Sequence, residues 1–498
     1  MLIGGLDIGT TGCKLTLFSE EGRQVHKEYS DYPVMRSLYI HEVDAEAIFA
    51  GVKKVISRTV SKYPEIAGIG ITSFGETFVL TDENGKPLRS AMLYTDPRGK
   101  EQCERLCGKI SPKTAAEISG VNPHEMYSLP KLMWIKENEP QLYAKTRHVF
   151  LMEDFVIFLL TGNSLIDYSL ATRTMGFDIH KLSWSRELFG AAGIDPGLMS
   201  EPVPTGTVAG TVTESASKLT GLGTNTKIIC VSHDQIAAAV GAGVFDSDTA
   251  VDGAGTVECI TPVYDGIPDM QVMARGNYAV VPYVIPGKYV CYAFSYTGGA
   301  LIKWCTDTIA KKEKETAEKE KISVNELMEA CSESPTGLLV LPHFAGAATP
   351  YMDSDSRGAI LGLTMATTAA DIYRACMEGV VYEMLLNLEC LKDSGIHFQN
   401  LRATGGGAHS EEWMQMKADI LNRTVTALDT VDAGTAGSAM LTGIAIGCFR
   451  NLKEAADIMV HEMAVYTPSE EMHEKYMNIY SRYRKLYSAV RGLASKIK

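Results

Sequence analysis

The chain has 498 residues, 45% of them apolar, a net charge of −13 and a pI near 5.4. This length exceeds one ordinary hydrophobic core, so we expect a globular protein of two or three domains. The acidic balance disfavours a nucleic-acid surface, which usually carries a concentrated basic patch, and favours a small-molecule partner.

The chain enters an apolar strand within its first residues, without the basic and apolar segments of a secretion signal. No apolar run approaches the roughly 20 residues that span a bilayer. The eleven cysteines are scattered, and the close pair Cys103 and Cys107 lacks the further ligands of a zinc site. We therefore expect a cytoplasmic protein with reduced, buried thiols and without a membrane or nucleic-acid partner.

The first unusual stretch is "GLDIGTTGCKLTLF", in which two apolar strands flank a short turn. Asp7 precedes the turn, Gly9, Thr10 and Thr11 form it, and Lys14 follows it. Glycine allows a tight turn, and successive backbone N–H groups in such a turn can face an anion. The stretch therefore suggests a phosphate-binding turn, although the signal is weak when it stands alone.

Short apolar strands and amphipathic helices then alternate, which is typical of layered α/β folds. We expect a helix over residues 44–63, a strand at "IAGIGIT" and a hairpin turn at "DENGKP". A later strand ends at His233, and Asp234 and Gln235 follow it. Ligands bind at such strand ends in α/β proteins, but Asp234 alone could equally be a helix N-cap.

Half the chain further on, "VDGAGTVECI" again places an aspartate, Asp252, shortly before a Gly-Thr turn formed by Gly255 and Thr256. This similarity suggests two related α/β domains that each offer a turn to a shared cleft, with coincidence as the alternative. The mixed charges of residues 311–321 predict an exposed helix with local ion pairs.

A third glycine-rich turn occurs in "ATGGGAHSEEWMQMKADIL", before a helix that Ser410 is expected to cap. A ribose or phosphate could approach this backbone closely, but glycines at helix starts also serve ordinary packing. The residues themselves leave both interpretations open.

Together with "SHDQ" and "SYTGGALIKW", these motifs resemble the FGGY carbohydrate kinases of the actin and sugar-kinase superfamily, in order along nearly the whole chain. Two longer segments, "MYSLPKLMWIKEN" and "GAILGLTMATTAADIYRACMEG", resemble the two signatures of that family, with Cys376 as an unusual residue in the second. The resemblance implies an α/β fold of two ribonuclease H-like domains, residues 1–243 and 244–498, around a central cleft for ATP and sugar.

The resemblance also implies roles for individual residues. Asp234 matches the catalytic base, and Asp7 would hold Mg²⁺ through water. ATP would contact Gly9, Thr10, Thr11 and Lys14 in the first domain, and Gly255, Thr256, Gly298, Gly299, Gly406, Gly407 and Ala408 in the second.

The acceptor pocket departs from the named members of the family. Gly75 and Glu76 stand where the xylulokinase pattern has Met-His and glycerol kinase has Arg-Glu, and Met126 replaces a tyrosine of glycerol kinase. Asp96 in "LYTDPR" matches the substrate turn of the family, and Gln235 adjoins Asp234. Three carboxylates, those of Glu76, Asp96 and Asp234, suit an uncharged polyhydroxylated acceptor.

The expected activity is therefore ATP-dependent phosphorylation of a neutral sugar or polyol, with a xylulose-like ketopentose as the first choice. A sugar-acid kinase of the gluconate type is the alternative within the class. A superfamily ATPase without sugar kinase activity, such as a chaperone or filament protein, and a sugar-sensing regulator are remote alternatives. We expect ATP, ADP and a sugar or polyol as partners, with a homodimer as an open possibility.

Overall fold

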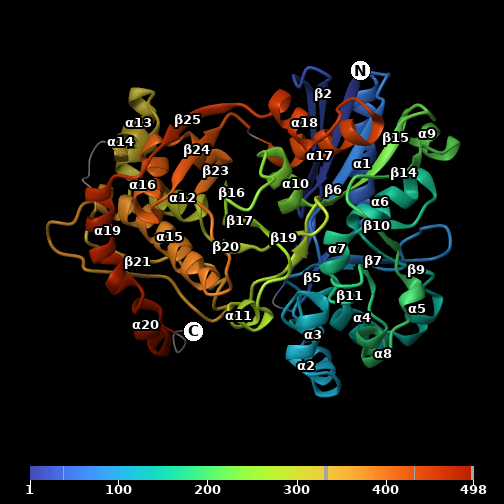
Figure 1. Cartoon of the computed structure of the whole chain (residues 1–498), viewed down its shortest axis with the longest axis horizontal. Helices are drawn as coiled ribbons and strands as arrows, with labels where there is room; N and C mark the ends of the chain where they lie inside the picture. Colours follow the sequence, from blue (N-terminus) through green and yellow to red (C-terminus); the bar gives the residue numbers. More distant parts are fainter. Residues whose placement is uncertain (38, 330–334, 431, 495–498) are drawn as a thin grey trace.

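Two sheets with the same strand order form the centres of two α/β halves, which lie side by side in Figure 1. The structure, a computed structural model, describes residues 1–37, 39–329, 335–430 and 432–494. The first sheet contains, in spatial order, β14 (Thr207–Thr211), β15 (Lys227–His233), β6 (Gly68–Ser73), β1 (Leu2–Ile8), β2 (Gly12–Ser19) and β3 (Gln24–Asp31). The second contains β25 (Glu462–Tyr466), β24 (Thr424–Leu428), β23 (Asn400–Thr404), β16 (Thr249–Ala254), β17 (Glu258–Asp265), β19 (Lys288–Val290) and β18 (Val281–Pro282), with β20 (Ala293–Ser295) also paired to β17.

The strand pairings of the two sheets correspond one by one. β1 pairs in parallel with β6 and antiparallel with β2, just as β16 pairs in parallel with β23 and antiparallel with β17. Asp7 and Asp252 lie in the corresponding strands β1 and β16. The expected α/β fold of two related halves is therefore confirmed, and the similarity between the two Gly-Thr turns has a structural origin.

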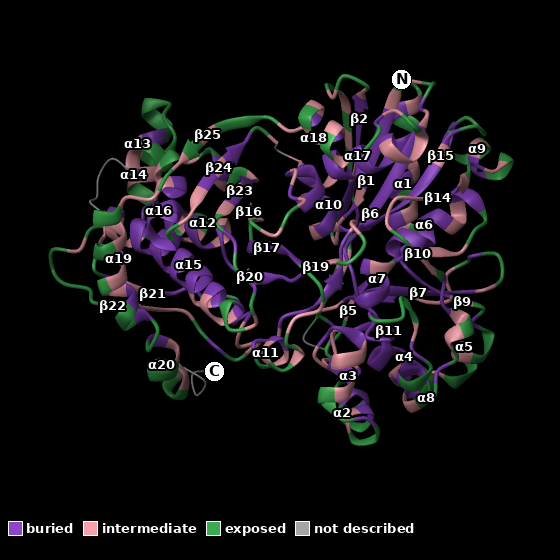
Figure 2. Ribbon diagram, viewed as in Figure 1, coloured by how far each residue is buried: buried purple, intermediate pink, exposed green. Residues whose placement is uncertain are grey.

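Helices cover both sheets, and the central strands are largely buried, whereas β3 and β25 at the sheet edges are mostly exposed or half-buried (Figure 2). In the first half the longer helices are α1 (Ala45–Val60), α2 (Lys100–Lys109), α3 (Pro112–Ser119), α4 (Ser128–Asn138), α6 (Met152–Thr161) and α10 (Asp234–Gly241), and the short α7 (Tyr168–Thr172) also borders the site. Those of the second part of the chain are α12 (Gly299–Thr308), α13 (Lys311–Glu320), α15 (Ala369–Lys392), α16 (Glu411–Leu421), α17 (Ala433–Ile446), α18 (Leu452–Met459), α19 (Glu470–Tyr483) and α20 (Leu486–Ala494).

Helices α10 and α17 cross with their backbones in direct contact. A Cβ atom on Gly241 would lie 2.0 Å from the carbonyl oxygen of Ala433, and one on Gly437 would lie 1.9 Å from that of Ala237. Although α17 comes late in the chain, it packs on the first sheet, where a Cβ on Gly5 would meet the Thr435 carbonyl oxygen at 2.0 Å. The domain boundary at residues 243 and 244 stays a prediction. Helix α17 follows this boundary in the chain but packs on the sheet of the first half.

Several local expectations are confirmed. Asp44 caps α1 by accepting from Glu46 N–H, and Ser410 caps α16 by accepting from Trp413 N–H. The turn at "DENGKP" closes as a hairpin turn through Leu88 N–H and Leu80 O, but β7 (Phe78–Thr81) pairs with β9 (His148–Leu151). The charged segment forms the exposed helix α13, and its Lys314 forms an ion pair outside the helix, with Asp307.

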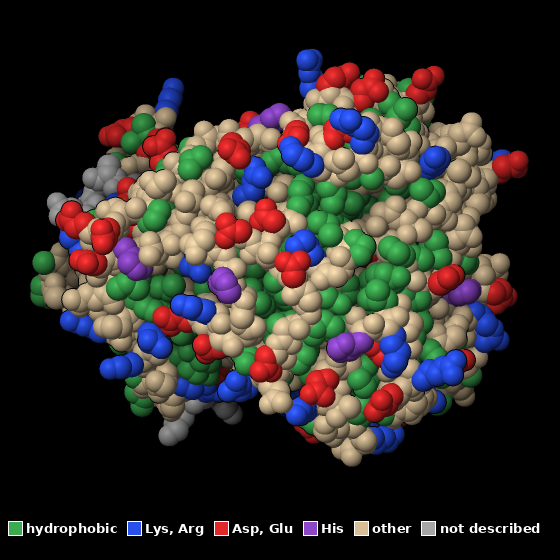
Figure 3. All heavy atoms as spheres, viewed as in Figure 1, with side chains coloured by type: hydrophobic (Ala, Val, Ile, Leu, Met, Phe, Trp, Pro, Cys, Tyr) green, Lys and Arg blue, Asp and Glu red, His purple; other side chains and the backbone are tan. Residues whose placement is uncertain are grey.

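Ten of the eleven cysteines lie in the described residues and all ten are free, seven of them buried; Cys331 lies outside the described residues. No helix in the described part of the chain is both long and apolar enough to cross a membrane. On the face seen in Figure 3, basic and acidic side chains are interspersed over both halves. This mixed face contrasts with the concentrated basic patch of a nucleic-acid surface.

The helix crossing yields a stability prediction. We expect Gly437→Ala to lower the free energy of unfolding by about 1–3 kcal/mol or more, because a methyl group would overlap a backbone carbonyl of α10. Gly108→Ala in α2 is the matched control, since a Cβ there meets nothing within 4 Å. The control should instead gain about 0.5–1 kcal/mol from helix propensity. Urea unfolding measures both, and equal losses in the two variants would contradict the close-contact interpretation.

Candidate active site

The first glycine-rich turn lies between β1 and β2 and brings the predicted phosphate-binding residues together. Asp7 stands opposite Lys14 in the antiparallel register, and Lys14 Nζ lies 3.3 Å from Asp7 Oδ2. The turn 9–11 is fixed from below, because the Tyr32 hydroxyl donates a hydrogen bond to the Gly9 carbonyl oxygen. The threonines at its tip are half-buried and exposed, respectively.

Asp432, which the sequence analysis did not select, reaches the same turn from the far end of the chain. It immediately precedes α17, and its Oδ1 lies 2.6 Å from Lys14 Nζ while its Oδ2 lies 2.8 Å from Lys27 Nζ. Its local sequence carries no site motif. Only the repeated topology could have indicated Asp432 as a site residue. Asp432 precedes the helix that follows β24, just as Asp234 begins the helix that follows the corresponding strand β15.

Asp234 begins α10 directly after β15, as the sequence predicts, and its side chain is 30% exposed. Burial raises the pKa of Asp234 to about 6, while hydrogen bonds from Gln235 and the charges of Arg173 and Lys14 oppose the rise. Burial likewise raises the pKa of Asp7 to about 6, with Lys14 opposing and Asp234 contributing. The charge of Lys14 therefore acts on both aspartates.

His233 adjoins Asp234 and connects it to the second half of the chain. His233 Nε2 lies 3.3 Å from Asp234 Oδ1, and His233 Nδ1 lies 3.1 Å from the Tyr292 hydroxyl. Burial and then the nearby charge of Arg173 lower the pKa of His233 to about 3, so its ring is neutral at physiological pH. A neutral ring can accept from the tyrosine at Nδ1 and donate to the carboxylate from Nε2.

Glu76 is buried, has the left-handed backbone angle φ of 61°, and is paired with Arg173, a residue that the sequence analysis missed. Arg173 Nε donates to Glu76 Oε1 at 2.5 Å, and Nη2 contacts the same oxygen. Gly75 makes this arrangement possible, because a Cβ there would lie 3.0 Å from Arg173 Cγ. A guanidinium group therefore reaches Glu76 from Arg173 at the end of α7, although Gly75 stands where glycerol kinase has its arginine.

Aromatic rings enclose this ion pair. The Arg173 guanidinium carbon lies 5.3 Å from the ring centre of Tyr127 and 5.5 Å from that of Tyr292. Tyr94, from the predicted substrate turn, has its pKa raised by burial and by Glu76, while a hydrogen bond with Thr10 opposes the rise. The charge of Glu76 thus acts on Tyr94 in the predicted substrate turn.

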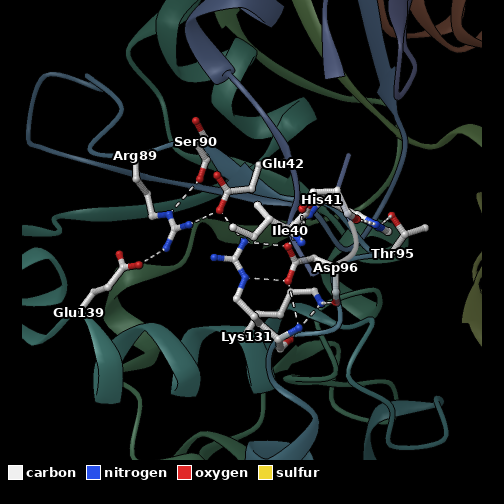
Figure 4. A network of polar contacts seen from close by, with 11 residues as sticks. Ile40, His41, Glu42, Arg89, Ser90, Thr95, Asp96, Lys131 and Glu139 are labelled. Carbon is white, nitrogen blue, oxygen red and sulfur yellow. Dashed lines mark hydrogen bonds and ion pairs between the residues drawn. The ribbon is translucent and has the colours of Figure 1, made fainter. Parts of the chain in front are cut away.

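Asp96 lies in a separate polar network, drawn in Figure 4. Its side chain is 0% exposed, and both oxygens are occupied by Arg98 while Oδ2 also accepts from His41 N–H at 2.8 Å. Although burial opposes it, these hydrogen bonds hold the pKa of Asp96 below its usual value. The structure therefore does not bring this carboxylate to Glu76 and Asp234, and its contact with an acceptor stays a prediction.

The predicted nucleotide residues of the second half border one cavity of 830 Å³. Its lining includes Gly255, Thr256, Gly299, Gly406 and Gly407, and all of its lining residues belong to the second half. Gly298 stands just behind, as the N-cap of α12, and Ala408 is buried below the third turn. The sequence predictions thus fall into two groups, one around Asp7 and Asp234 and one in this cavity.

Comparison with known proteins finds the same family along both halves. The model described as "FGGY family of carbohydrate kinases, N-terminal domain" matches residues 2–241, and the model of the C-terminal domain matches residues 267–446.

Individual relatives agree over nearly their full length. The chain is 26% identical to the xylulose kinase of Bacillus subtilis (strain 168), over 99% of this chain and 98% of that protein. It is 27% identical to the gluconokinase of the same organism, over 95% and 93% of the two chains. The crystal structure of ligand-bound xylulose kinase from Lactobacillus acidophilus superposes with a TM-score of 0.90 at 22% identity, covering 100% of both chains.

The buried pair of Glu76 and Arg173 yields a second prediction. We expect Arg173→Met to destabilise the fold by about 3–5 kcal/mol, because it leaves the Glu76 carboxylate buried without a partner. Adding Glu76→Gln should recover much of this loss, since the remaining side chain is uncharged. Denaturant unfolding of the single and double variants gives the coupling free energy. Additive losses would show that the two side chains do not stabilise each other.

Proposed function

Because this chain belongs to the FGGY family of carbohydrate kinases, we propose that it transfers the γ-phosphoryl group of ATP to a hydroxyl group of a neutral ketose or polyol. Family membership gives a phosphotransferase with a carbohydrate acceptor, and ATP is the phosphoryl donor that the family implies. The first candidate acceptor is a xylulose-like ketopentose, supported by the full-length similarity to a xylulose kinase.

The observation that carries the proposal of a neutral acceptor is the ion pair of Glu76 and Arg173. Two guanidinium nitrogens already lie on Oε1, which leaves Oε2 to accept hydrogen bonds from hydroxyl groups. Asp234 adds a second carboxylate nearby. An anionic sugar acid would bring further negative charge against both groups, which disfavours its binding. A gluconate-type acceptor is the second candidate, because of the similarity to a gluconokinase.

In the proposed mechanism Asp234 accepts the proton of the attacking hydroxyl group as the phosphoryl group moves across the cleft. A sugar hydroxyl is a weak nucleophile at neutral pH, so a positioned carboxylate lowers the barrier. His233 orients this carboxylate, while Lys14 and the turn 9–11 stabilise the charge that develops on the phosphates. The cavity bordered by Gly255 and Gly406 binds the nucleotide.

The residues at the first turn also fit a magnesium ion. Asp7 offers a partly exposed carboxylate, a hard oxygen ligand of the kind that Mg²⁺ prefers. Within the described ranges no group of three or more His, Cys, Asp or Glu side chains could hold a metal ion, so Asp7, water and ATP phosphates would supply the ligands. When bound, Mg²⁺ would neutralise phosphate charge. The cytoplasmic location and a homodimer stay predictions.

The direct test is coupled ADP release with Mg²⁺ and ATP across ketoses, polyols, aldoses and sugar acids. The proposal expects strong stimulation by one neutral sugar or polyol. Stimulation by a sugar acid alone would support the second candidate instead. ADP release that no acceptor changes would indicate an ATPase and contradict the proposal.

The base assignment yields a third prediction. We expect Asp234→Asn to bind ATP and acceptor but to transfer the phosphoryl group at least about a hundredfold more slowly, because the amide cannot accept the proton. Isothermal titration with ADP verifies binding, and initial rates of ADP release measure the transfer. Near-normal activity of the variant would remove Asp234 from this role.

The raised pKa values yield a fourth prediction, for pH. A carboxylate must be ionised to act as a base, so kcat/KM for the acceptor should fall below about pH 6 and approach a loss of about tenfold per pH unit at lower pH. Asp7, whose pKa is also raised to about 6, can steepen this fall. A rate profile that stays flat from pH 7 down to pH 5 would contradict the assignment.

A further inference from the structure

Two lysines, Lys131 and Lys417, are among the largest fully buried side chains of the protein, with exposures of 0% and 1%. Lysine is rarely buried to this extent, because removing its charge from water is costly unless it is paired. One of the two lies in each half, Lys131 in α4 and Lys417 in α16. Neither belongs to the groups placed in the mechanism above.

Lys131 holds the backbone of the turn that carries Tyr94. Its Nζ donates to the carbonyl oxygen of Asp96 at 2.5 Å and to that of Arg98 at 3.3 Å (Figure 4). Burial lowers the pKa of Lys131 to about 8, while the charge of Asp96 opposes the decrease. The ammonium group thus connects α4 to the predicted acceptor turn, and Ser128 at the start of the same helix donates to the Glu76 carbonyl oxygen at 2.7 Å.

Lys417 supports the second Gly-Thr turn by binding side-chain carboxylates, whereas Lys131 binds backbone carbonyl oxygens. Its Nζ lies 2.5 Å from Asp252 Oδ2 and also contacts Glu258 Oε1, and both carboxylates are 0% exposed. Asp252 is in β16 and Glu258 in β17, so the two residues flank the turn that contains Gly255 and Thr256.

The same group reaches the other nucleotide turns. A Cβ on Gly298 would lie 3.0 Å from Glu258 Oε2, so the N-terminus of α12 packs directly on this carboxylate. Lys417 Nζ lies 4.8 Å from the ring centre of Trp413, which itself lines the nucleotide cavity. Lys417 is therefore the contact that joins β16, β17 and α16 beneath the cavity.

We propose that Lys131 and Lys417 are positioning residues, one for each substrate, with Lys131 fixing the acceptor turn and Lys417 fixing the nucleotide turns. The inference rests on the proposed assignment of acceptor and nucleotide to the two halves. A buried ammonium group can hold several oxygen atoms at fixed separation, and loss of such support displaces the turn above it. Displacements of about 1 Å at a binding turn are enough for large losses in binding or rate.

The test compares Lys131→Met with Lys417→Met, each of which should weaken the binding of one substrate and leave that of the other unchanged. We expect Lys417→Met to raise the KM for ATP and the Kd for ADP about tenfold, with the acceptor KM within about twofold of the parent value. Lys131→Met should raise the acceptor KM about tenfold and leave the Kd for ADP within about twofold. A general loss of structure would move both constants in both variants. Such a common change, or no change in either variant, would overturn the proposal.

A further variant tests the same cluster in case Lys417→Met does not fold. Glu258→Gln leaves the pair of Lys417 and Asp252 in place and removes one of two buried carboxylates that compete for one lysine. We expect it to fold and to weaken ADP binding about threefold without affecting the acceptor KM. Unchanged ADP binding in a folded Glu258→Gln would overturn the role of this cluster. Circular dichroism and thermal unfolding establish that each variant is folded.

Failure of the proposed function gives a different result. In that case the wild-type protein phosphorylates no acceptor of the panel, whereas calorimetry with ADP still compares Lys417→Met and Glu258→Gln with the wild type. If ADP binds equally well to all three proteins, the proposed role of Lys417 in fixing the nucleotide turns is wrong, whatever the acceptor is.

Discussion

The backbone contact between α10 and α17 is the constraint on which the site depends. Because Gly241 and Gly437 carry no side chains, the two helices approach until the carbonyl groups of each occupy the space that a Cβ of the other would need. Each helix begins beside an aspartate, Asp234 for α10 and Asp432 for α17. A rigid crossing therefore fixes both carboxylates relative to Asp7, which lies in the strand beneath α17.

The corresponding Gly-Thr turns of the two halves are supported by different means. In the first half Asp7 and Lys14 remain partly exposed, so a ligand can exchange for their mutual contact. In the second half Asp252 is fully buried and its lysine comes from α16. A buried carboxylate requires a permanent partner, whereas an exposed one does not. The same topology thus supports the proposed catalytic residues on one side and the proposed nucleotide turns on the other.

Sequence patterns predicted the parts of the structure that depend on neighbouring residues. Periodicity and capping predicted α1 and α16, and the Gly-Thr motifs predicted the two turns and their equivalence. Arg173, Asp432 and Lys417 were missed as site residues because their partners lie about 100 to 400 positions away, and local sequence carries no record of such contacts. Asp96 shows the opposite case, a motif residue whose carboxylate is occupied within its own turn.

The distribution of partners also separates structural carboxylates from reactive ones. Glu76 and Asp96 are each bound by a guanidinium group, which fixes them in place, and the hydrogen bonds from Arg98 hold the pKa of Asp96 below its usual value. Asp234 has only the neutral His233 and Gln235 within hydrogen-bonding distance among the described residues, so burial is free to raise its pKa to about 6. A carboxylate with that pKa is ionised at neutral pH and still basic enough to accept a proton. Of the three carboxylates predicted to face the acceptor, Asp234 is therefore the one suited to proton transfer in the proposed mechanism.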